Sequence, residues 1–289
     1  MRIARVLRED PDESSALPLL ALERDGALYD VGELDRVFGT PYDPDLFPGA
    51  TDFHTRVIAL GAAGLQALDE RLRAGERPTE ARLLPGSFVW LPPCDTERVL
   101  HVQLAAYDPP GSRPTYRFGN ARGLLGHDEA VVFPAEETRP EFELGLAAVL
   151  REDLRCATAE DADQAILGYA ILNGWCGRDE ITHAPAAARR VASQLGPVLV
   201  TGDEIGDLAC LRAQARVNGQ VIASTTAGGW TTPPAEAIAW LSRWIDLRSG
   251  DVIGLGALHG GCGAAPHGST IDLLIERLGK LTGRPVRGG

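Results

Sequence analysis

The sequence predicts a mixed, β-rich α+β fold, and three observations support this class. Short apolar segments of strand length recur along most of the chain. Two pairs of them flank Asp25-Gly26 and Asn218-Gly219, the strongest short signals for a β-hairpin. Only three stretches have helical character, and they do not alternate with strands in a βαβ rhythm, so a doubly wound parallel sheet is not expected.

Residues 1–78 are expected to form a small strand-rich N-terminal domain. The segment "LLALERDGALYDV" predicts its hairpin, and residues 52–74 predict one amphipathic helix whose middle is weakened by Gly61 and Gly64. A proline-rich passage follows, with "PGSFVWLPPCD" and "YDPPGSRPTY", which is typical of short strands and turns. The apolar residues of the helix recur at near-helical spacing: Phe53, Val57, Leu60, Leu65, Leu68 and Leu72.

The larger predicted domain spans residues 79–289. Its segments "EAVVFP" and "EFELGLAAVL" predict strands. Thr158 is expected to cap a helix that runs through "AEDADQAILGYAILN", with Asp161 as its capping-box partner. "PPAEAIAWLSRWI" predicts a further helix, and "GDVIGLG" and "IDLLIERLG" predict closing strands.

Composition excludes several classes of function. The 289 residues carry a net charge of −12, which argues against nucleic acid or an anionic membrane as a partner because both require a basic face. No apolar run approaches 18 residues, and "MRIARVLRED" lacks the apolar core of a signal peptide. The five cysteines are scattered, odd in number and without CxxC, a pattern that favours reduced thiols in a cytoplasmic protein.

Common catalytic and cofactor motifs are missing from the sequence. There is no G-x-S-x-G element and no G-x-G-x-x-G fingerprint. The glycine-rich stretch "GALHGGCGAAPHG" lacks the G-K-[ST] of a phosphate loop. Its His259, Cys262 and His267 match no standard zinc spacing, so no cofactor is expected.

Five segments from residue 80 onward carry a resemblance. "EFELGLAAVL" is similar to D-F-E-L-E-V-A-A-V, and "GYAILNGWCGRD" to G-Y-T-I-x-N-D-W-S-A-R-D. "LGPVLVT", "VNGQ" and "SGDVIGLGALHGGCG" are similar to L-G-P-W-L-V-T, a V-N-G hairpin and P-G-D-V-I-G-S-G-T-x-G-G-G-C-L. Together they resemble the fumarylacetoacetate hydrolase family. The resemblance implies a β-roll core, a homodimer, and a divalent cation that polarises a dicarbonyl or keto-acid substrate.

The positions at which the family holds its metal differ in this chain. The first metal-binding glutamate corresponds to Glu143, but the second corresponds to Gly145 and the third carboxylate to Gly174. One carboxylate is too few for a hard divalent cation, so no metal is expected. Further polar positions of the family fall on Ala187, with Arg189 two residues later, and on Ala257 and Ala265.

The lost ligands became glycine or alanine and not bulky apolar residues, which predicts an emptied cavity that still holds a molecule. The expected catalytic residues are Glu143, Asp179 and His259. The residues expected to bind substrate lie mainly in "ILNGWCGRDE", residues 171–180. They are Asn173, Trp175, Cys176, Arg178 and Cys262.

Several of these residues have a structural alternative. Arg178 and Asp179 either pair to pin their loop or act as an anion clamp or acid–base pair. Cys176 fits a small buried residue better than a nucleophile, because a reactive thiol needs a neighbouring base. Glu143 is either a structural carboxylate or a general base. The sequence assigns no role to His101, Tyr107, His183 and His267.

The leading hypothesis is a repurposed pocket for a carbonyl-bearing small metabolite, with metal-independent proton-transfer chemistry of the isomerase, cyclase, dehydratase or lyase type. One alternative is a catalytically inactive binding protein or partner subunit. Another is a metal-dependent C–C hydrolase or decarboxylase, which would require a two-residue shift that makes Glu141 and Glu143 the ligand pair.

Overall fold

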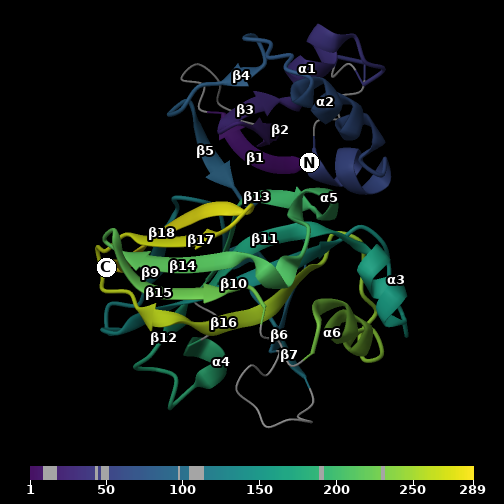
Figure 1. Cartoon of the computed structure of the whole chain (residues 1–289). Coiled ribbons are helices and arrows are strands. Elements are labelled where there is room, and N and C mark those ends of the chain that lie inside the picture. The colour runs from purple at the N-terminus through teal and green to yellow at the C-terminus, as the bar shows by residue number, and fades with distance from the viewer. Residues whose placement is uncertain are drawn as a thin grey trace.

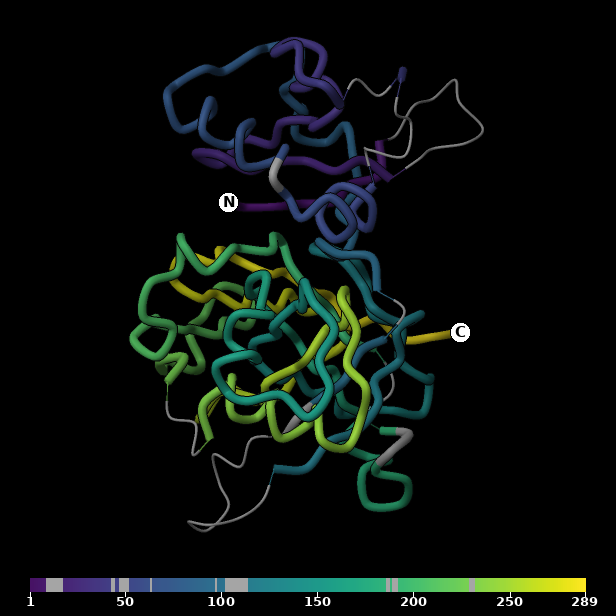
Figure 2. Tube along the Cα trace, turned by 90° about the vertical axis from the view of Figure 1, so that its right-hand side faces the viewer, coloured from purple at the N-terminus to yellow at the C-terminus, as the bar shows by residue number. Residues whose placement is uncertain are grey.

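The computed structural model describes residues 1–8, 18–42, 45–46, 52–96, 98–103, 114–188, 192–228 and 232–289. An N-terminal unit, β1 to β5, is stacked on one end of a larger unit formed by residues 92–289 (Figure 1). The view at a right angle shows the same stacking (Figure 2). No helix among the described residues is long and apolar enough to cross a membrane.

The N-terminal unit contains the first predicted hairpin. β2 (Pro18–Arg24) and β3 (Ala27–Asp30) pair antiparallel. Asp25 and Gly26 have φ angles of 54° and 78°, which a tight two-residue hairpin loop requires and which an Asp-Gly pair adopts readily. β1 (Arg2–Arg8) adds to β2, so three antiparallel strands form the base of the unit.

The predicted single helix over residues 52–74 is wrong. The chain forms a π-helical segment, η2 (His54–Ala59), then turns, and resumes as α2 (Ala63–Arg73). The turn contains Gly61 and Ala62 with φ angles of 64° and 59°, and two successive left-handed residues end a right-handed helix. α1 (Val31–Phe38) precedes it. The predicted apolar residues still form a core, apart from exposed Leu60: Phe53, Val57, Leu65, Leu68 and Leu72.

The two units share one sheet. β1 pairs with β2 on one edge and with β13 (Ser193–Thr201) of the larger unit on the other. β4 (Arg82–Leu83) pairs with β3, and β5 (Phe88–Leu91) pairs with β1. β4 and β5 thus add to the same strands of the N-terminal unit, and the domain boundary expected after residue 78 stays a prediction.

The central sheet of the larger unit has the order β13-β11-β10-β16-β6-β7. β10 lies in its middle, with β11 and β16 antiparallel on either side. The bounds of its other strands are β6 (Val99–Gln103), β7 (Thr115–Phe118), β8 (Leu124–Leu125), β10 (Pro140–Leu150), β11 (Ile166–Gly174), β12 (Cys176–Gly177) and β16 (Val252–Ala264). The 3₁₀ turn η3 (Ala121–Gly123) leads into β8.

The helix predicted after Thr158 is correct at its start and wrong at its end. Thr158 and Asp161 form the predicted capping box, and α3 (Ala159–Gln164) follows. The rest of the predicted helix is β11, which lies between β10 and β13. Because both faces of β11 are covered, its apolar run lacks the alternation that marks a half-exposed strand.

A second sheet, with the order β15-β14-β17-β18-β9, packs on the first. The predicted hairpin at Asn218 and Gly219 joins β14 and β15, and these residues have φ angles of 50° and 80°. The strand bounds are β9 (Ala130–Phe133), β14 (Arg212–Val217), β15 (Gln220–Thr226), β17 (Ile271–Ile275) and β18 (Gly279–Arg287). The remaining short elements are α4 (Pro185–Ala188), α5 (Gly202–Ile205), η4 (Leu208–Cys210) and α6 (Pro234–Leu241). The predicted fold class, mixed and β-rich α+β, is confirmed.

The central sheet is strongly curled. Nε2 of His101 on β6 lies 3.2 Å from Oγ of Ser193 on β13, although β11, β10 and β16 separate these two strands in the sheet. The pair can meet only across the concave face. The residues that fill this face belong to a core that continues into the N-terminal unit, including Val99, Ala147, Leu172 and Leu195.

One buried histidine makes the stability of the fold depend on pH. Burial lowers the pKa of His127 to about 4. Its Nδ1 accepts a hydrogen bond from the backbone N–H of Thr282 at 3.0 Å, and its ring stands edge-on to Trp90 with the centroids 5.2 Å apart. Protonation of Nδ1 would break this hydrogen bond and place a charge beside the indole ring.

We expect the free energy of unfolding to fall as the pH drops from about 6.5 to about 4. The unfolded chain binds a proton at His127 near pH 6.5, whereas the folded chain does so only near pH 4. The contribution of neutral His127 to the free energy of unfolding is therefore full above pH 6.5 and is lost as the pH falls toward 4. The loss is up to about 3 kcal/mol. Urea unfolding across this pH range should show this loss of stability. The variant His127→Asn, which keeps an acceptor for Thr282, should remove most of the pH dependence. An equal slope in both proteins would contradict this account.

Candidate functional site

Glu143 lies near the middle of the central sheet, on the concave face of β10. Its neighbours on the two adjacent strands are Gly174 on β11 and Cys262 on β16. Because Gly174 has no side chain, the Glu143 carboxylate leans over it, and Oε2 lies 2.7 Å from the point that a Cβ of Gly174 would occupy. The carboxylate is partly buried, so it lies at the boundary between the core and solvent.

Asn173 points to the opposite face of β11 because side chains alternate along a strand, and Trp175 directly follows the end of that strand. Asn173 is 1% exposed, and its Oδ1 accepts the backbone N–H of Glu143 at 3.0 Å. Trp175 is 1% exposed, donates from Nε1 to Oε1 of Gln194 at 3.3 Å and packs edge-on against Phe133. These contacts account for both residues without a ligand, and their predicted contact with substrate stays a prediction.

The ion pair between Arg178 and Asp179, one of the two alternatives for these residues, is not formed, because each residue has another partner. Nη1 of Arg178 lies 3.6 Å from Oε2 of Glu141. Asp179 forms an ion pair with Arg139, and its Oδ2 accepts from the hydroxyl of Thr138 at 2.6 Å and from the backbone N–H of Thr138 at 2.8 Å. Arg178 therefore contacts strand β10, whereas Asp179 contacts the loop that precedes this strand.

These contacts decide what Asp179 can do chemically. The hydroxyl and the N–H of Thr138, together with the Arg139 guanidinium, hold the pKa of Asp179 well below its usual range. Such a carboxylate is a weak proton acceptor at neutral pH, whereas an effective general base has a pKa near the operating pH. The geometry favours Asp179 as the anchor of its loop over a direct role in proton transfer.

β16 is irregular where it passes Glu143. Cys262 is opposite Glu143 and Ala257 is opposite Gly145, so six residues of β16 face three of β10 and the strand bulges. The predicted residue His259 lies on this bulge and is exposed, as is Cys262. The bulge therefore places an imidazole and a thiol at the surface.

The other residues singled out by the sequence lie farther from Glu143 along the strands. Cys176 is 2% exposed and faces Glu141 across the β10–β12 pair. His183 is exposed in the turn that follows β12. Nε2 of His267 donates to the backbone carbonyl of Glu137 at 2.8 Å. Tyr107 and Arg189 lie outside the described residues.

The residues present do not fit the divalent cation that the resemblance implies. Glu143 supplies a carboxylate, but Gly145 and Gly174 supply no side-chain oxygen. Glu141 lies on the same face, yet Arg178 already holds its carboxylate. Among the residues that the structure describes, no group of three or more His, Cys, Asp or Glu side chains is arranged to hold a metal ion. A hard cation needs more anionic oxygens than this arrangement offers.

The emptied cavity predicted from the replaced positions does not extend to Gly145, because the surrounding chain fills the space there. A Cβ at Gly145 would lie 2.6 Å from the carbonyl oxygen of Gly256, at the start of the β16 bulge. The Leu172 side chain crosses the same region, and its Cδ2 would lie 2.7 Å from a Cβ of Gly254. The backbone of β16 and the side chain of Leu172 thus occupy the space beside Gly145.

We expect Gly145→Ala to destabilise the fold by about 1–3 kcal/mol, because the new methyl group meets a backbone carbonyl that cannot move alone. Gly174→Ala is the matched control. Its methyl group meets only the end of the Glu143 side chain, which can rotate away, so we expect a loss below about 1 kcal/mol. Urea unfolding of the two variants measures the difference, and equal losses would contradict the packing described at Gly145.

Sequence reasoning missed one pair of polar residues on the concave face. Ser193 is 4% exposed and His101 is 8% exposed, and they contact each other as described above. Ser193 is directly opposite Gly174 in the β11–β13 register, so Ser193, Gly174 and Glu143 form a row across three strands. Sequence analysis assigned no role to His101 and did not single out Ser193. The contact between the two residues depends on the curl of the sheet, which no local sequence pattern indicates.

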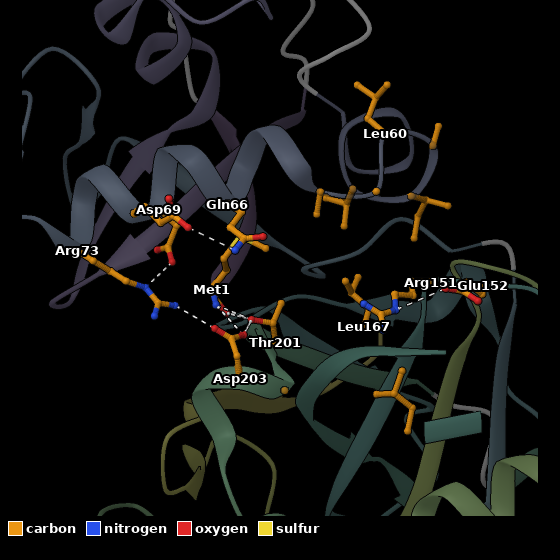
Figure 3. A pocket seen from close by; sticks show the side chains of 18 residues that line it. Met1, Leu60, Gln66, Asp69, Arg73, Arg151, Glu152, Leu167, Thr201 and Asp203 are labelled. Atoms are coloured by element: carbon orange, nitrogen blue, oxygen red, sulfur yellow. Dashed lines mark hydrogen bonds and ion pairs between the residues drawn. The ribbon is translucent and has the colours of Figure 1, made fainter. Parts of the chain in front are cut away.

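Two cavities among the described residues lie away from this row. One of about 870 Å³ separates α2 and η2 of the N-terminal unit from the larger unit, and Figure 3 shows Leu60, Gln66, Leu167 and Thr201 on its walls. Another, of about 320 Å³, lies beside Asp179. Glu143 is in the lining of neither of these two cavities.

Comparison with known proteins decides the family. Residues 94–286 match the family model described as fumarylacetoacetate (FAA) hydrolase, C-terminal. The chain belongs to the fumarylacetoacetate hydrolase family. The match covers the larger unit from its first residues to β18, in agreement with the five segments noted in the sequence.

Relatives within the family are enzymes. A human mitochondrial protein named oxaloacetate tautomerase is 26% identical over 178 residues, which are 57% of this chain and 57% of that protein. A Bacillus subtilis protein with the same activity in its name is 30% identical over 170 residues, 55% of this chain and 56% of that one. The chain therefore matches little more than half the length of these relatives.

Solved structures show the same fold over the whole chain. A 5-carboxymethyl-2-hydroxymuconate delta-isomerase from Mycobacterium smegmatis superposes with a TM-score of 0.73 at 21% identity, and the match covers 100% of both chains. This likeness extends the shared fold to the N-terminal unit, which lies outside the family match.

Proposed function

We propose that the chain moves a proton on a small carbonyl-bearing molecule, in the manner of an isomerase or tautomerase, without a divalent metal ion. The observation that carries this proposal is Glu143, a partly buried carboxylate retained at a site whose other residues offer no ligand set for a hard cation. The names of the relatives support the reaction class, since tautomerases and isomerases act by proton transfer. No cofactor is proposed.

Glu143 acts in this scheme as the base that removes a proton from the carbon next to a carbonyl group. Returning the proton to another carbon or to oxygen completes an isomerisation, and no group other than the proton is transferred. The Glu143 carboxylate is partly buried and leans over Gly174, which places it at the edge of the core. Arg178 lies two residues beyond Cys176 and forms an ion pair with Glu141. In this scheme its guanidinium also binds an acidic group of the substrate.

The test uses oxaloacetate as the probe, because two relatives carry it in their names. The enol form absorbs in the ultraviolet, so its interconversion with the keto form can be followed directly in buffer that contains excess EDTA. We expect acceleration that EDTA leaves unchanged. No acceleration of oxaloacetate interconversion, and no exchange of α-protons for deuterium on pyruvate or oxaloacetate, would refute the proposal.

A second candidate is a catalytically silent binding or partner subunit. The closed packing at Gly145 favours it, because the backbone of β16 leaves less room beside Glu143 than an open pocket would need. The anchoring of Asp179 by Thr138 and Arg139 also suits a purely structural loop. Assembly as a homodimer and a cytoplasmic location are parts of the proposal that suit either candidate.

A metal-dependent hydrolase or decarboxylase is the weaker alternative. It would need Glu141 and Glu143 as a ligand pair, and both do lie on one face of β10, two residues apart. Glu141, however, already has Arg178 as its partner at 3.6 Å. A cation would have to displace that guanidinium and then find its remaining ligands outside these two residues.

A further inference from the structure

We infer that Ser193, held in place by His101, is the hydrogen-bond donor that stabilises the negative oxygen formed when Glu143 removes a proton from the substrate. The inference rests on the proposed function and assigns it a second catalytic residue, Ser193, and a positioning residue, His101. The juxtaposition that carries it is the row Ser193–Gly174–Glu143 on the concave face of the sheet.

The row places Ser193 and Glu143 on the two strands that flank Gly174. Residues directly opposite each other on paired strands share a face, so Ser193 and the missing side chain of Gly174 point into the same space. Glu143 reaches over Gly174 from the other side. The Cα atoms of Ser193 and Glu143 are roughly 10 Å apart, twice the spacing of neighbouring strands. Gly174 thus lies between the Ser193 hydroxyl and the backbone of Glu143, and the Glu143 carboxylate reaches over it toward the Ser193 side.

His101 fixes the direction of the Ser193 hydroxyl. Its Nε2 lies 3.2 Å from the Ser193 Oγ, and close packing holds the ring. A Cβ at Gly119 would lie 2.9 Å from Nε2, and a Cβ at Gly254 would lie 3.1 Å from Nδ1. When Nε2 carries the proton it donates to Oγ, and the hydroxyl hydrogen is left to point at the substrate. A donor fixed in advance costs no reorganisation during the reaction.

The proposed reaction needs only the substrate and side chains that this protein contains. The bond between the α-carbon and its hydrogen breaks, the proton passes to a Glu143 oxygen, and the electron pair moves into the C–C bond as the carbonyl oxygen becomes negative. Ser193 donates a hydrogen bond to that oxygen and keeps its own proton. Glu143 then returns the proton to a second position of the delocalised anion. Ser193 thus provides charge stabilisation that a Lewis acid could otherwise supply.

The alternative is that His101 and Ser193 serve only to fasten β6 to β13 and so hold the curl of the sheet. This structural role predicts a change in stability with no change in the activity of the folded protein. The two roles therefore differ in what they predict for kcat, for the melting temperature and for the binding of an anion that mimics the enolate.

The experiment compares Ser193→Ala, Ser193→Thr and His101→Gln with the wild type in the oxaloacetate assay with EDTA. We expect Ser193→Ala to lower kcat roughly 100-fold with KM changed by less than about 3-fold, as for the loss of one oxyanion donor. Ser193→Thr keeps the hydroxyl and should retain most of the activity. His101→Gln should lower kcat by an intermediate factor. Ser269→Ala is the matched control, because Ser269 is another buried, hydrogen-bonded serine and lies outside this row.

A binding measurement separates the inference from folding defects. Oxalate mimics a planar enolate, so Ser193→Ala should weaken oxalate binding by calorimetry at least 10-fold while pyruvate binding changes little. If the wild type is active and folded Ser193→Ala matches it in kcat and in oxalate affinity, the inference is wrong and the proposed function stands. If the wild type neither binds oxalate nor accelerates interconversion, the proposed function fails and the inference fails with it.

Discussion

Replacing Glu143 with glutamine is expected to lower the rate of oxaloacetate interconversion by roughly 100- to 10,000-fold, the range attributed to a general base. Glutamine has the same shape and can lie over Gly174 in the same way, but it cannot accept a proton. The melting temperature should change little, because the side chain is partly exposed and fills no enclosed core. Steady-state kinetics in EDTA, with folding checked by circular dichroism, measures the effect.

Glu141→Gln is the control for Glu143→Gln, since Glu141 lies two residues away on the same face of β10. This change weakens the contact with Arg178 but removes no proposed proton acceptor, so we expect a change in kcat of only a few fold. Equal losses in the two variants, or near-normal activity of Glu143→Gln, would show that the carboxylate of Glu143 is not the base.

Trp175→Ala is expected to lower the free energy of unfolding by about 3–5 kcal/mol, the usual cost of removing a large buried aromatic side chain. The ring is 1% exposed, packs against Phe133 and donates a hydrogen bond to Gln194, so the variant leaves both a cavity and an unpaired amide oxygen. Urea unfolding measures the loss. A loss below about 1 kcal/mol would contradict the packing role.

Trp244→Ala is the matched control, because Trp244 is 64% exposed and should cost less than about 0.5 kcal/mol. Trp175→Phe keeps part of the side-chain volume of Trp175. This variant distinguishes a packing role of Trp175 from a role in substrate binding. A packing role predicts an unchanged KM for oxaloacetate in Trp175→Phe, whereas the substrate contact predicted from the sequence would raise it.

Local sequence signals predicted the local structure well. Asp25-Gly26 and Asn218-Gly219 form hairpins because both positions of each pair accept positive φ, a property of the residues themselves. The capping box at Thr158 is equally local. The end of that helix was mispredicted because β11 is covered on both faces, so its apolar run could not be distinguished from a buried helix.

The candidate site depended more on tertiary structure than on sequence. Glu143 lies beside Gly174, as the pairing of their strands requires, and its role stays a prediction. The partner of Asp179 is Arg139, 40 positions away, and no local pattern indicates that contact. The filling of the space at Gly145 depends on the bulge of β16. The meeting of His101 with Ser193 depends on the curl of the whole sheet.

The central claim is that proton transfer at Glu143 operates without a divalent cation. Titration of manganese into the purified, chelator-treated protein by calorimetry, with the activity of the same sample followed in parallel, tests it most directly. We expect no saturable uptake at micromolar manganese and a turnover rate that is the same with and without the ion. Tight binding of one manganese ion per chain, together with activity that appears only when the ion is present, would contradict the claim.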